Sequence, residues 1–339
     1  MFNLGKTLRY ALGAAALSFA VSAVTTPSPA VADGTKIVFS TDWGYNGRHA
    51  YYFTALKKGY YAEEGLDVEI LGGRGSGTVI KEVAAGTLDI GFADSGTLAI
   101  ARANENVPVK LVAVVYADSP HALIVLKDSG IKNAKDLEGK TLSDAAGSSN
   151  YKLFPAYARA GGADPAKAEW VFSESTALVG LLLSGKVDAI GQFSVGAPLL
   201  AKRAAPKEIS VLHYKDAPGF EIYSNGIIVR EDTLKEKPEM VKKFVRASMK
   251  GLRDAINNPQ ETAEIMKSYH RQVETDITVG EIGMVGGIAE NDMTAKHGLG
   301  YIDEKKLQST IDLAASVFEF KRPLKAAEMY VSGFTGDIK

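Results

Sequence analysis

The sequence predicts an α/β protein of two lobes joined by a two-segment hinge, with a cleft between the lobes. Three observations support this fold class. Short apolar runs alternate with helical stretches from residue 36 onward, as expected for alternating strands and helices. The alternation starts again after Ser119-Pro120. The chain of 339 residues is also long enough for two units of ordinary domain size.

The first 32 residues are expected to be a cleaved signal peptide. Lys6 and Arg9 give a positive start, residues 11–24 form an almost unbroken apolar run, and residues 30–32 match an A-x-A cleavage site. The apolar run is shorter than the ~20 residues that a membrane-spanning helix needs. Export therefore explains this segment better than an uncleaved membrane anchor. We expect the mature chain to be a free periplasmic protein.

The composition excludes several classes of protein. Cysteine is absent, which excludes disulfides, thiolate metal sites, cysteine nucleophiles and a lipid-modified cysteine. Loss of Lys6 and Arg9 with the signal peptide changes the formal charge from −1 to −3, so the chain offers no field that attracts nucleic acid. The signatures G-x-S-x-G and H-E-x-x-H are missing. We expect no cofactor, no metal site and no enzymatic activity.

Residues 33–117 are expected to form the first part of lobe I. The predicted strands cover 36–41, 67–71, 88–92 and 109–116, and the predicted helices cover 48–58 and 78–85. The Gly-rich turn at 72–77 lacks the Lys-Ser/Thr ending of a P-loop. Because strands and helices alternate, we expect a parallel sheet.

Residues 118–221 are expected to form lobe II, and 222–339 to return to lobe I. The hinge segments are expected near 117–118 and 218–221. In lobe II the predicted strands cover 121–127, 169–172 and 187–190, a further unit starts at 140–142, and the predicted helices cover 151–160 and 177–184. The returning segment is expected to start with a strand at 222–229 and to continue with helices at 238–257, 259–269, 278–289 and 304–318.

The candidate binding residues follow from one rule about open α/β sheets. Ligands bind there at the carboxyl ends of the strands, so the loops after the predicted strands are candidates. These loops combine small hydroxyl residues, glycine and aromatic rings, which suits a pocket that stacks on a flat ligand and hydrogen-bonds to its rim. The candidates are Trp43, Tyr45, Asn46, His49, Arg74, Ser76, Ser95, Thr97, Tyr116, Ser148, Ser149, Asn150, Gln192, Phe193 and Asn225.

Several of these candidates also have a purely structural explanation. Trp43 and Tyr45 can roof the sheet, and a lone histidine such as His49 is more often a packing or capping residue. Residues 148–150 can simply cap a helix. Arg74 can pair with an acidic neighbour as readily as with a ligand.

A D-W-x-x-N-x-x-H run at 42–49, followed by G-x-x-x-x-E-G-L-x-V at 59–68, resembles the NMT1/THI5-like family. The resemblance covers residues 36–229 and, more loosely, the C-terminal helices. It implies the type II periplasmic binding protein fold and a role as the substrate-binding protein of an ABC importer. It also implies two partners, a small-molecule ligand and an inner-membrane permease. Further matching stretches lie at 82–91, 136–141 and 183–189.

The run at 42–49 looks more like the pyrimidine and riboflavin branch of this family than the sulfonate branch. That branch implies that Trp43 stacks on a heteroaromatic ring, with Asn46 and His49 at its edge. The chain departs from the branch at 47–52 and at 192–194. We expect a small aromatic or heteroaromatic nutrient, bound by a monomer whose hinge closes on it.

Two alternatives remain open, and the residues argue against a third. Arg74, with helix starts at Ser76 and Ser148, can instead hold an alkanesulfonate, a taurine-like ligand or another organic anion. The same module can also hand its closed form to a membrane receptor as a sensor. The resemblance also implies enzymes among the fungal relatives, but those that make the thiamine pyrimidine need a cysteine-rich motif, and the absence of cysteine together with the expected signal peptide argues against that role here.

Overall fold

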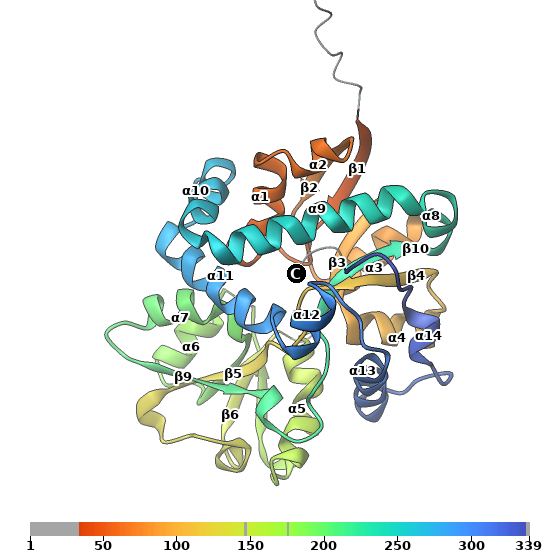
Figure 1. Ribbon diagram of the computed structural model, residues 1–339. Coiled ribbons are helices and arrows are strands. Elements are labelled where there is room, and N and C mark those ends of the chain that lie inside the picture. Colours follow the sequence, from red (N-terminus) through yellow and green to blue (C-terminus); the bar gives the residue numbers. More distant parts are fainter. Residues whose placement is uncertain (1–33, 146–147, 175, 337–339) are drawn as a thin grey trace, which may run out of the picture. The chain divides into compact units, whose positions relative to one another are not determined.

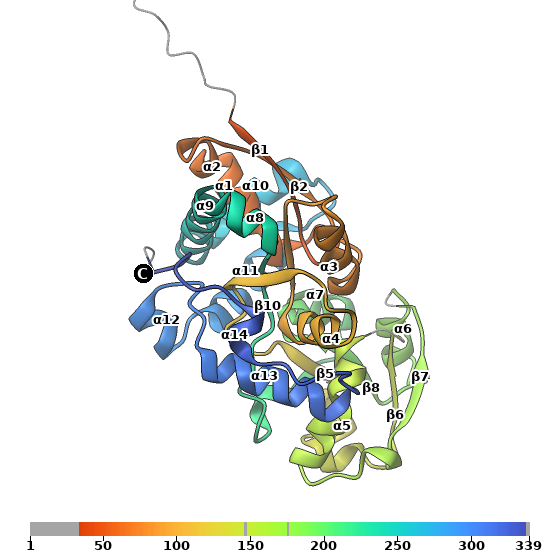
Figure 2. The ribbon, with the colours of Figure 1, turned by 90° about the vertical axis from the view of Figure 1, so that its right-hand side faces the viewer.

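The computed structural model describes residues 34–145, 148–174 and 176–336 (Figure 1). The expected signal peptide at 1–32 lies outside these ranges. The described chain contains two five-stranded sheets, and helices cover both faces of each sheet (Figure 2).

The first sheet has the strand order β2-β1-β3-β10-β4. β1 pairs in parallel with β2 and β3, whereas β10 runs antiparallel to both β3 and β4. The prediction of a parallel sheet is therefore wrong for β10. This strand returns directly from the other sheet, without the crossover helix that makes consecutive strands parallel. The strands are β1 (Thr35–Ser40), β2 (Leu66–Leu71), β3 (Ile90–Asp94), β4 (Val109–Val114) and β10 (Asn225–Arg230).

The second sheet repeats this topology with the order β7-β6-β8-β5-β9. Its antiparallel strand is β5, which lies between β8 and β9. The chain thus passes between the sheets twice, once between β4 and β5 and once between β9 and β10. The strands are β5 (His121–Leu126), β6 (Thr141–Asp144), β7 (Glu169–Phe172), β8 (Ala189–Phe193) and β9 (Ile209–His213).

Two separate apolar cores hold the helices against the first sheet. On one face Phe39 contacts Tyr52 and Phe244, with ring centroids 4.4 and 5.1 Å away. On the other face Val79 and Leu307 belong to a second buried cluster. The first core carries α1 (Ala50–Lys57), α2 (Tyr60–Glu63), α9 (Pro238–Asn257), α10 (Pro259–Tyr269) and α11 (Thr275–Ala289), and the second carries α3 (Ser76–Ala85), α4 (Ser95–Glu105) and α13 (Glu304–Val317).

The second sheet has the same arrangement with shorter helices. α5 (Ser149–Ala160) packs on one face, and α6 (Leu178–Leu183) with α7 (Ala197–Ala204) packs on the other. Further short helices are α8 (Glu231–Glu236), α12 (Asp292–His297) and α14 (Ala326–Met329).

Two helices of the C-terminal segment contact elements around both sheets. α11 contacts α7 and the 3-10 helix η5 (Ser194–Gly196), and α13 contacts both α4 and α5. The two sheets are thus connected by packed helices as well as by two chain segments. Within the described ranges, no helix combines the length and apolarity needed to cross a membrane.

Candidate functional site

The loop after β1 is held in place by the Gly-rich turn after β2. The N–H of Gly73 donates to the carbonyl of Trp43 (3.1 Å), and the N–H of Gly75 donates to the carbonyl of Asp42 (2.8 Å). A Cβ on Gly73 would lie 2.0 Å from the carbonyl oxygen of Thr41, so only glycine fits this close approach. The turn therefore positions the backbone that carries Trp43.

A buried ion pair forms the base of this loop. Arg48 Nη2 donates to both carboxylate oxygens of Asp42, at 3.2 and 3.1 Å, and His49 Nε2 lies 2.7 Å from Asp42 Oδ1. Burial raises the pKa of Asp42, but Arg48 and His49 together bring it below its ordinary value. Burial lowers the pKa of His49, so its ring is neutral at pH 7 and donates through Nε2. Both members of the Asp42–Arg48 pair remain charged.

Trp43 differs from its neighbours because its side chain is exposed. Its relative exposure is 48%, whereas Asp42 and His49 are buried at 5% and 0%. Tyr45 packs inward, where its ring stacks on His270 at 3.8 Å and its hydroxyl donates to the carbonyl of Ile70. The candidates in this loop are thus one exposed ring, the half-buried Tyr45 and Asn46, and the buried His49.

A second polar network connects the ends of β3 and β10. Asp94 Oδ1 accepts from the N–H and the hydroxyl of Thr97, at 2.7 and 2.8 Å, and so caps α4. Asp94 Oδ2 accepts from the Ser224 hydroxyl, and the Asp94 N–H donates to Ser76 Oγ. Ser95 Oγ donates to the Ser224 carbonyl. Ser76, Ser95 and Thr97 are therefore connected through Asp94 and Ser224, which the sequence analysis did not single out.

Tyr116 and Asn225 belong to the buried part of the same region. Both side chains have 0% exposure, and the Tyr116 N–H donates to the Asn225 carbonyl at 2.9 Å. Burial raises the pKa of Tyr116, so its hydroxyl stays protonated. Asn225 pairs with Asp94 across β10 and β3.

The candidates of the second sheet gather around His121 at the start of β5. His121 Nε2 lies 3.0 Å from Ser149 Oγ, and His121 Nδ1 lies 2.8 Å from Ser119 Oγ. Ser148 caps α5 by accepting from the Asn150 N–H, and Asn150 Oδ1 accepts from the Ala122 N–H. The loop residues 146–147 between these elements lie outside the described ranges.

Arg48 connects the two groups of candidates. Its guanidinium lies over the ring of Phe193, with 5.6 Å from Cζ to the ring centre. Phe193 ends β8 beside the half-buried Gln192, and its ring meets His121 edge-on at 4.9 Å. The segment after β1 and the end of β8 are thus in direct contact. Arg48, like Asp42, was absent from the predicted residues, although the six-residue spacing of opposite charges was a usable signal.

Arg74 has a different environment from the other candidates. Its side chain is 82% exposed, and Nη2 lies 3.6 Å from the carboxylate of Glu82. An exposed pair of this kind contributes little to stability. Arg48 and Arg74 both follow strand ends, and each has an acidic partner, Asp42 and Glu82 respectively.

Two further buried carboxyl groups lie beside the candidate residues. Burial raises the pKa of Asp144 to about 6 and that of Glu281 to about 7. Asp144 ends β6 and fills the space beside Gly191, where a Cβ would lie 1.9 Å from Asp144 Oδ2. Its Oδ2 has no hydrogen-bond partner. Glu281 lies on α11, far from the loops in sequence, which explains why the strand-end rule missed it.

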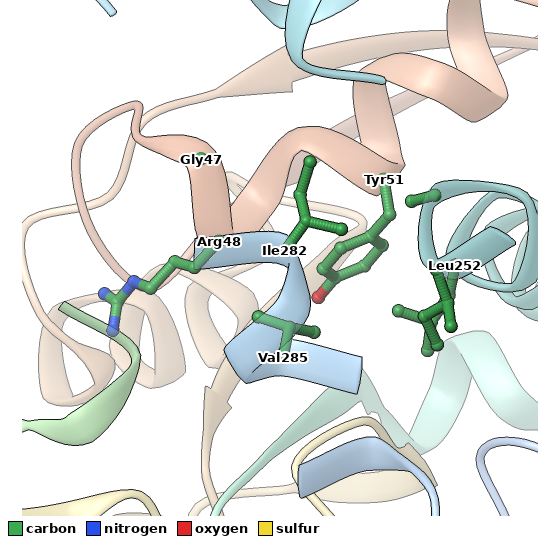
Figure 3. Close-up of a pocket in the computed structure, with 8 residues that line it drawn as sticks. Gly47, Arg48, Tyr51, Leu252, Ile282 and Val285 are labelled. Atoms are coloured by element: carbon green, nitrogen blue, oxygen red, sulfur yellow. The ribbon is translucent and has the colours of Figure 1, made fainter. Parts of the chain in front are cut away.

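A narrow hollow lies behind the loop, between α1, α9 and α11 (Figure 3). Its lining is mostly apolar. The Tyr51 hydroxyl points toward Ile282 and Val285, whereas the Arg48 side chain points away from these residues (Figure 3). In the part of the chain that the structure describes, no three histidine or acidic side chains gather closely enough to hold a metal ion.

Comparison with known proteins gives a family and several relatives. The model of the NMT1/THI5-like family matches residues 46–262. The riboflavin-binding protein RibY of Chloroflexus aurantiacus is 28% identical over 303 residues, which is 85% of this chain and 83% of that protein. The formylaminopyrimidine-binding protein of Halalkalibacterium halodurans is 24% identical over 225 residues, or 66% and 68% of the two chains.

Two relatives are named as enzymes, and the similar solved structures include both binding proteins and an enzyme. A 4-amino-5-hydroxymethyl-2-methylpyrimidine phosphate synthase of Legionella pneumophila is 26% identical over 246 residues, 72% of this chain and 76% of that one. The alkanesulfonate-binding protein SsuA of Xanthomonas axonopodis pv. citri, bound to MOPS, superposes with a TM-score of 0.70 at 12% identity. That match covers 89% of this chain and 100% of the other. At this identity the match shows the two-lobed fold alone.

Proposed function

Because this chain belongs to the NMT1/THI5-like family, we propose that it is the ligand-binding component of an ABC importer. It binds one small aromatic or heteroaromatic nutrient between its two lobes and passes it to an inner-membrane permease. Two relatives that match most of the chain are binding proteins, one for riboflavin and one for formylaminopyrimidine. The mechanism is hinge closure, in which a ligand that contacts both lobes favours the closed state.

The contact between Arg48 and Phe193 carries this proposal. It brings together the segment that follows the carboxyl end of β1 and the carboxyl end of β8, one from each sheet. Ligands of open α/β sheets bind at such ends. Trp43 is exposed in the same loop as Arg48, so its ring is free to stack on a guest.

The charges around these residues favour a ring with hydrogen-bond donors over an anion. Arg48 is already paired with Asp42, and Arg74 is exposed and paired with Glu82. One buried acceptor in the loop of Trp43, Asn46 Oδ1, has no hydrogen-bond partner. An acceptor of this kind suits an N–H group of a heteroaromatic ligand, whereas a sulfonate offers it no donor.

The remaining parts of the proposal concern the chain around the site. Residues 1–32 act as a signal peptide that delivers a monomer to the periplasm. Residues 33–117 with 222–339 form lobe I, and residues 118–221 form lobe II. Both lobes contribute site residues from the ends of their strands. Trp43 and Asn46 touch the ligand, and His49 holds their loop. The protein binds its ligand without changing it, and the absence of cysteine separates it from relatives that depend on a cysteine-rich motif.

A thermal-shift screen followed by X-ray scattering tests this function. Flavins, pyrimidines, aromatic acids and sulfonates are added to the mature protein. A ligand at 100 times its Kd stabilises the folded state by about 2.7 kcal/mol, which raises the Tm by several degrees. We expect a ring compound to give this shift and to make the protein more compact. A scattering profile that stays unchanged at saturating ligand would contradict hinge closure.

A further inference from the structure

Glu281 lies directly over the start of the helix that follows the ligand loop. Its side chain is 5% exposed, and a Cβ on Gly47 would come within 2.5 Å of Glu281 Oε2. The backbone N–H groups of Gly47 and Arg48, together with the Arg48 guanidinium, stabilise the ionised form of this carboxyl and so limit the rise in its pKa. Glu281 therefore supplies an acceptor for the first turn of η1 (Gly47–His49), which has no side-chain cap of its own.

The residue next to Glu281 contacts the other lobe. A Cβ on Gly280 would come within 2.9 Å of Pro198 Cβ on α7, so the two helices pack closely there. Lys202 on α7 donates to Glu274 and Asp276 at the start of α11, at 2.5 and 3.0 Å. One face of α11 thus holds the ligand loop while the adjoining face packs on lobe II.

The charge of this cluster depends on Glu281. Arg48 is attracted by both Asp42 and Glu281, and the cluster is neutral with one carboxylate and negative with two. His49 is neutral because burial lowers its pKa, and Tyr51 and Tyr116 are neutral because burial raises theirs. On the α7 side the charged group is Lys202, which is bound to the acidic residues at the start of α11.

We propose that Glu281 is a positioning residue that connects the ligand loop to the packing of α11 on lobe II, so that ligand affinity depends on the charge of Glu281. This inference rests on the proposed function and names the residue that makes ligand binding pH-dependent. Ionised Glu281 holds the N–H groups of Gly47 and Arg48 and orders the loop that carries Trp43 and Asn46. Protonated Glu281 is a weaker acceptor, and the loop loses this support.

Burial raises the pKa of Glu281 to about 7, which sets the range in which the effect occurs. Above pH 7 the carboxylate is ionised and the loop is ordered. The N–H groups of Gly47 and Arg48 lower this pKa, so the pKa is higher in a loosened loop in which Glu281 stays buried. As the pH falls through this range the group takes up a proton, and ligand affinity decreases because the bound state favours the ionised form. Well above and well below this range, ligand affinity no longer changes with pH.

Hydrogen exchange in the absence of ligand tests the inference independently of what the protein binds. Amides 47–49 of the full mature chain are followed at pH 8 and pH 6, with rates corrected for intrinsic exchange. We expect roughly fivefold less protection at pH 6, because a pKa one unit higher in the loosened loop than in the ordered loop changes the ratio of the two states about fivefold between pH 8 and pH 6. Glu281→Gln should remove the pH dependence, and protection that changes equally in wild type and Glu281→Gln would overturn the inference.

Two controls keep the result interpretable. Glu290→Gln changes an exposed carboxylate at the C-terminal end of the same helix and should leave the wild-type pH dependence intact. If Glu281→Gln fails to fold, a carbon-13 NMR titration of Glu281 in the wild type replaces it. A midpoint near that of an ordinary glutamate would overturn the inference.

Riboflavin titrations at the same two pH values then test the effect on affinity. Wild type should bind about fivefold more weakly at pH 6 than at pH 8, and Glu281→Gln should bind equally at both. Unchanged wild-type affinity would overturn the link to binding. A lack of riboflavin binding at either pH would count against the ligand proposed here, while the exchange experiment would still decide the role of Glu281.

Discussion

The guanidinium of Arg48 lies over the ring of Phe193, 5.6 Å from its centre. This contact joins the segment after β1 of the first sheet to the last residue of β8 in the second sheet. Arg48 holds Asp42 at the same time, through two hydrogen bonds from one nitrogen. A displacement of Phe193 therefore displaces Arg48 and, through it, Asp42, the residue next to Trp43. Hinge closure that moves Phe193 should therefore also move Trp43, the ring proposed to stack on the ligand.

Replacement of Trp43 should remove binding and preserve the fold. Trp43 is 48% exposed, so Trp43→Ala should change the free energy of unfolding by no more than about 0.5 kcal/mol. Loss of stacking should weaken a ring ligand roughly tenfold, since stacking of a heteroaromatic ring on an aromatic side chain contributes about 1–3 kcal/mol. Calorimetric titration with riboflavin and urea unfolding measure the two effects.

Tyr269→Ala is the matched control for this change. Tyr269 is an exposed aromatic residue of α10, at 41%, and its ring contacts Phe53 away from the strand ends. We expect its replacement to leave ligand affinity unchanged. An equal loss of affinity in both variants would mean that Trp43 acts only through general stability.

Arg74→Ala distinguishes a ring ligand from an anion. Arg74 is 82% exposed and its partner Glu82 lies 3.6 Å away, so its removal should cost less than about 0.5 kcal/mol of stability. Affinity for a neutral ring should also remain unchanged. Binding of an alkanesulfonate that disappears in this variant, and that weakens steeply with added salt, would favour the anion alternative instead.

Gly73→Ala should disturb the ligand loop from a distance. Its Cβ would lie 2.0 Å from the Thr41 carbonyl, so the turn must move and lose its hydrogen bond to Trp43. We expect a loss of about 1–3 kcal/mol in the free energy of unfolding, together with weaker ligand binding. Chemical unfolding and ligand titration measure both quantities.

Gly77→Ala, four residues further along, provides the control for Gly73. Nothing lies within 4 Å of its Cβ position, and it belongs to α3. Alanine restricts the unfolded chain more than glycine does, so we expect a gain of about 0.5 kcal/mol and normal binding. A destabilised Gly77→Ala would show that the whole turn, rather than the Gly73 contact, is sensitive to substitution.

Asp42→Asn should strongly destabilise lobe I. It leaves the charge of Arg48 buried without its partner, which costs about 3 kcal/mol. Because the pKa of Asp42 is lowered in the folded protein, its stabilisation is present above the unfolded value of about 3.9 and is lost as the pH falls through the folded value. Urea unfolding from pH 7 down to pH 3 should show a smaller acid-induced loss in the variant.

The exposed Asp67 of β2 controls for the removal of a charge. Asp67→Asn should keep the wild-type stability and the wild-type acid dependence. If Asp42→Asn were as stable as Asp67→Asn at pH 7, the pair with Arg48 would not be the base of the loop.

Much of the fold was predictable because its elements carry strong local signals. The helices at 238–257 and 259–269 and the strand at 169–172 were predicted with the bounds that the structure has. Proline at the first helical position marks the start of both helices. β9 was missed because its residues are mostly half-buried at a sheet edge, which weakens the alternation of buried and exposed positions.

The direction of β5 and β10 was not predictable from local patterns. An antiparallel strand inside a sheet has the same apolar run as a parallel one, and direction depends on how the chain crosses between the sheets. The strand-end rule did select Ser76, Ser95 and Thr97, whose side chains belong to the polar network at the ends of β3 and β10. It missed Asp94 and Ser224, whose contact joins residues 130 positions apart.

The most direct test of the account is native mass spectrometry of the mature protein purified from its own periplasm, with tandem fragmentation of any retained small molecule. We predict one aromatic or heteroaromatic molecule for each chain, lost in Trp43→Ala and kept in Tyr269→Ala. A retained sulfonate or other non-aromatic acid, held equally by both variants, would contradict it.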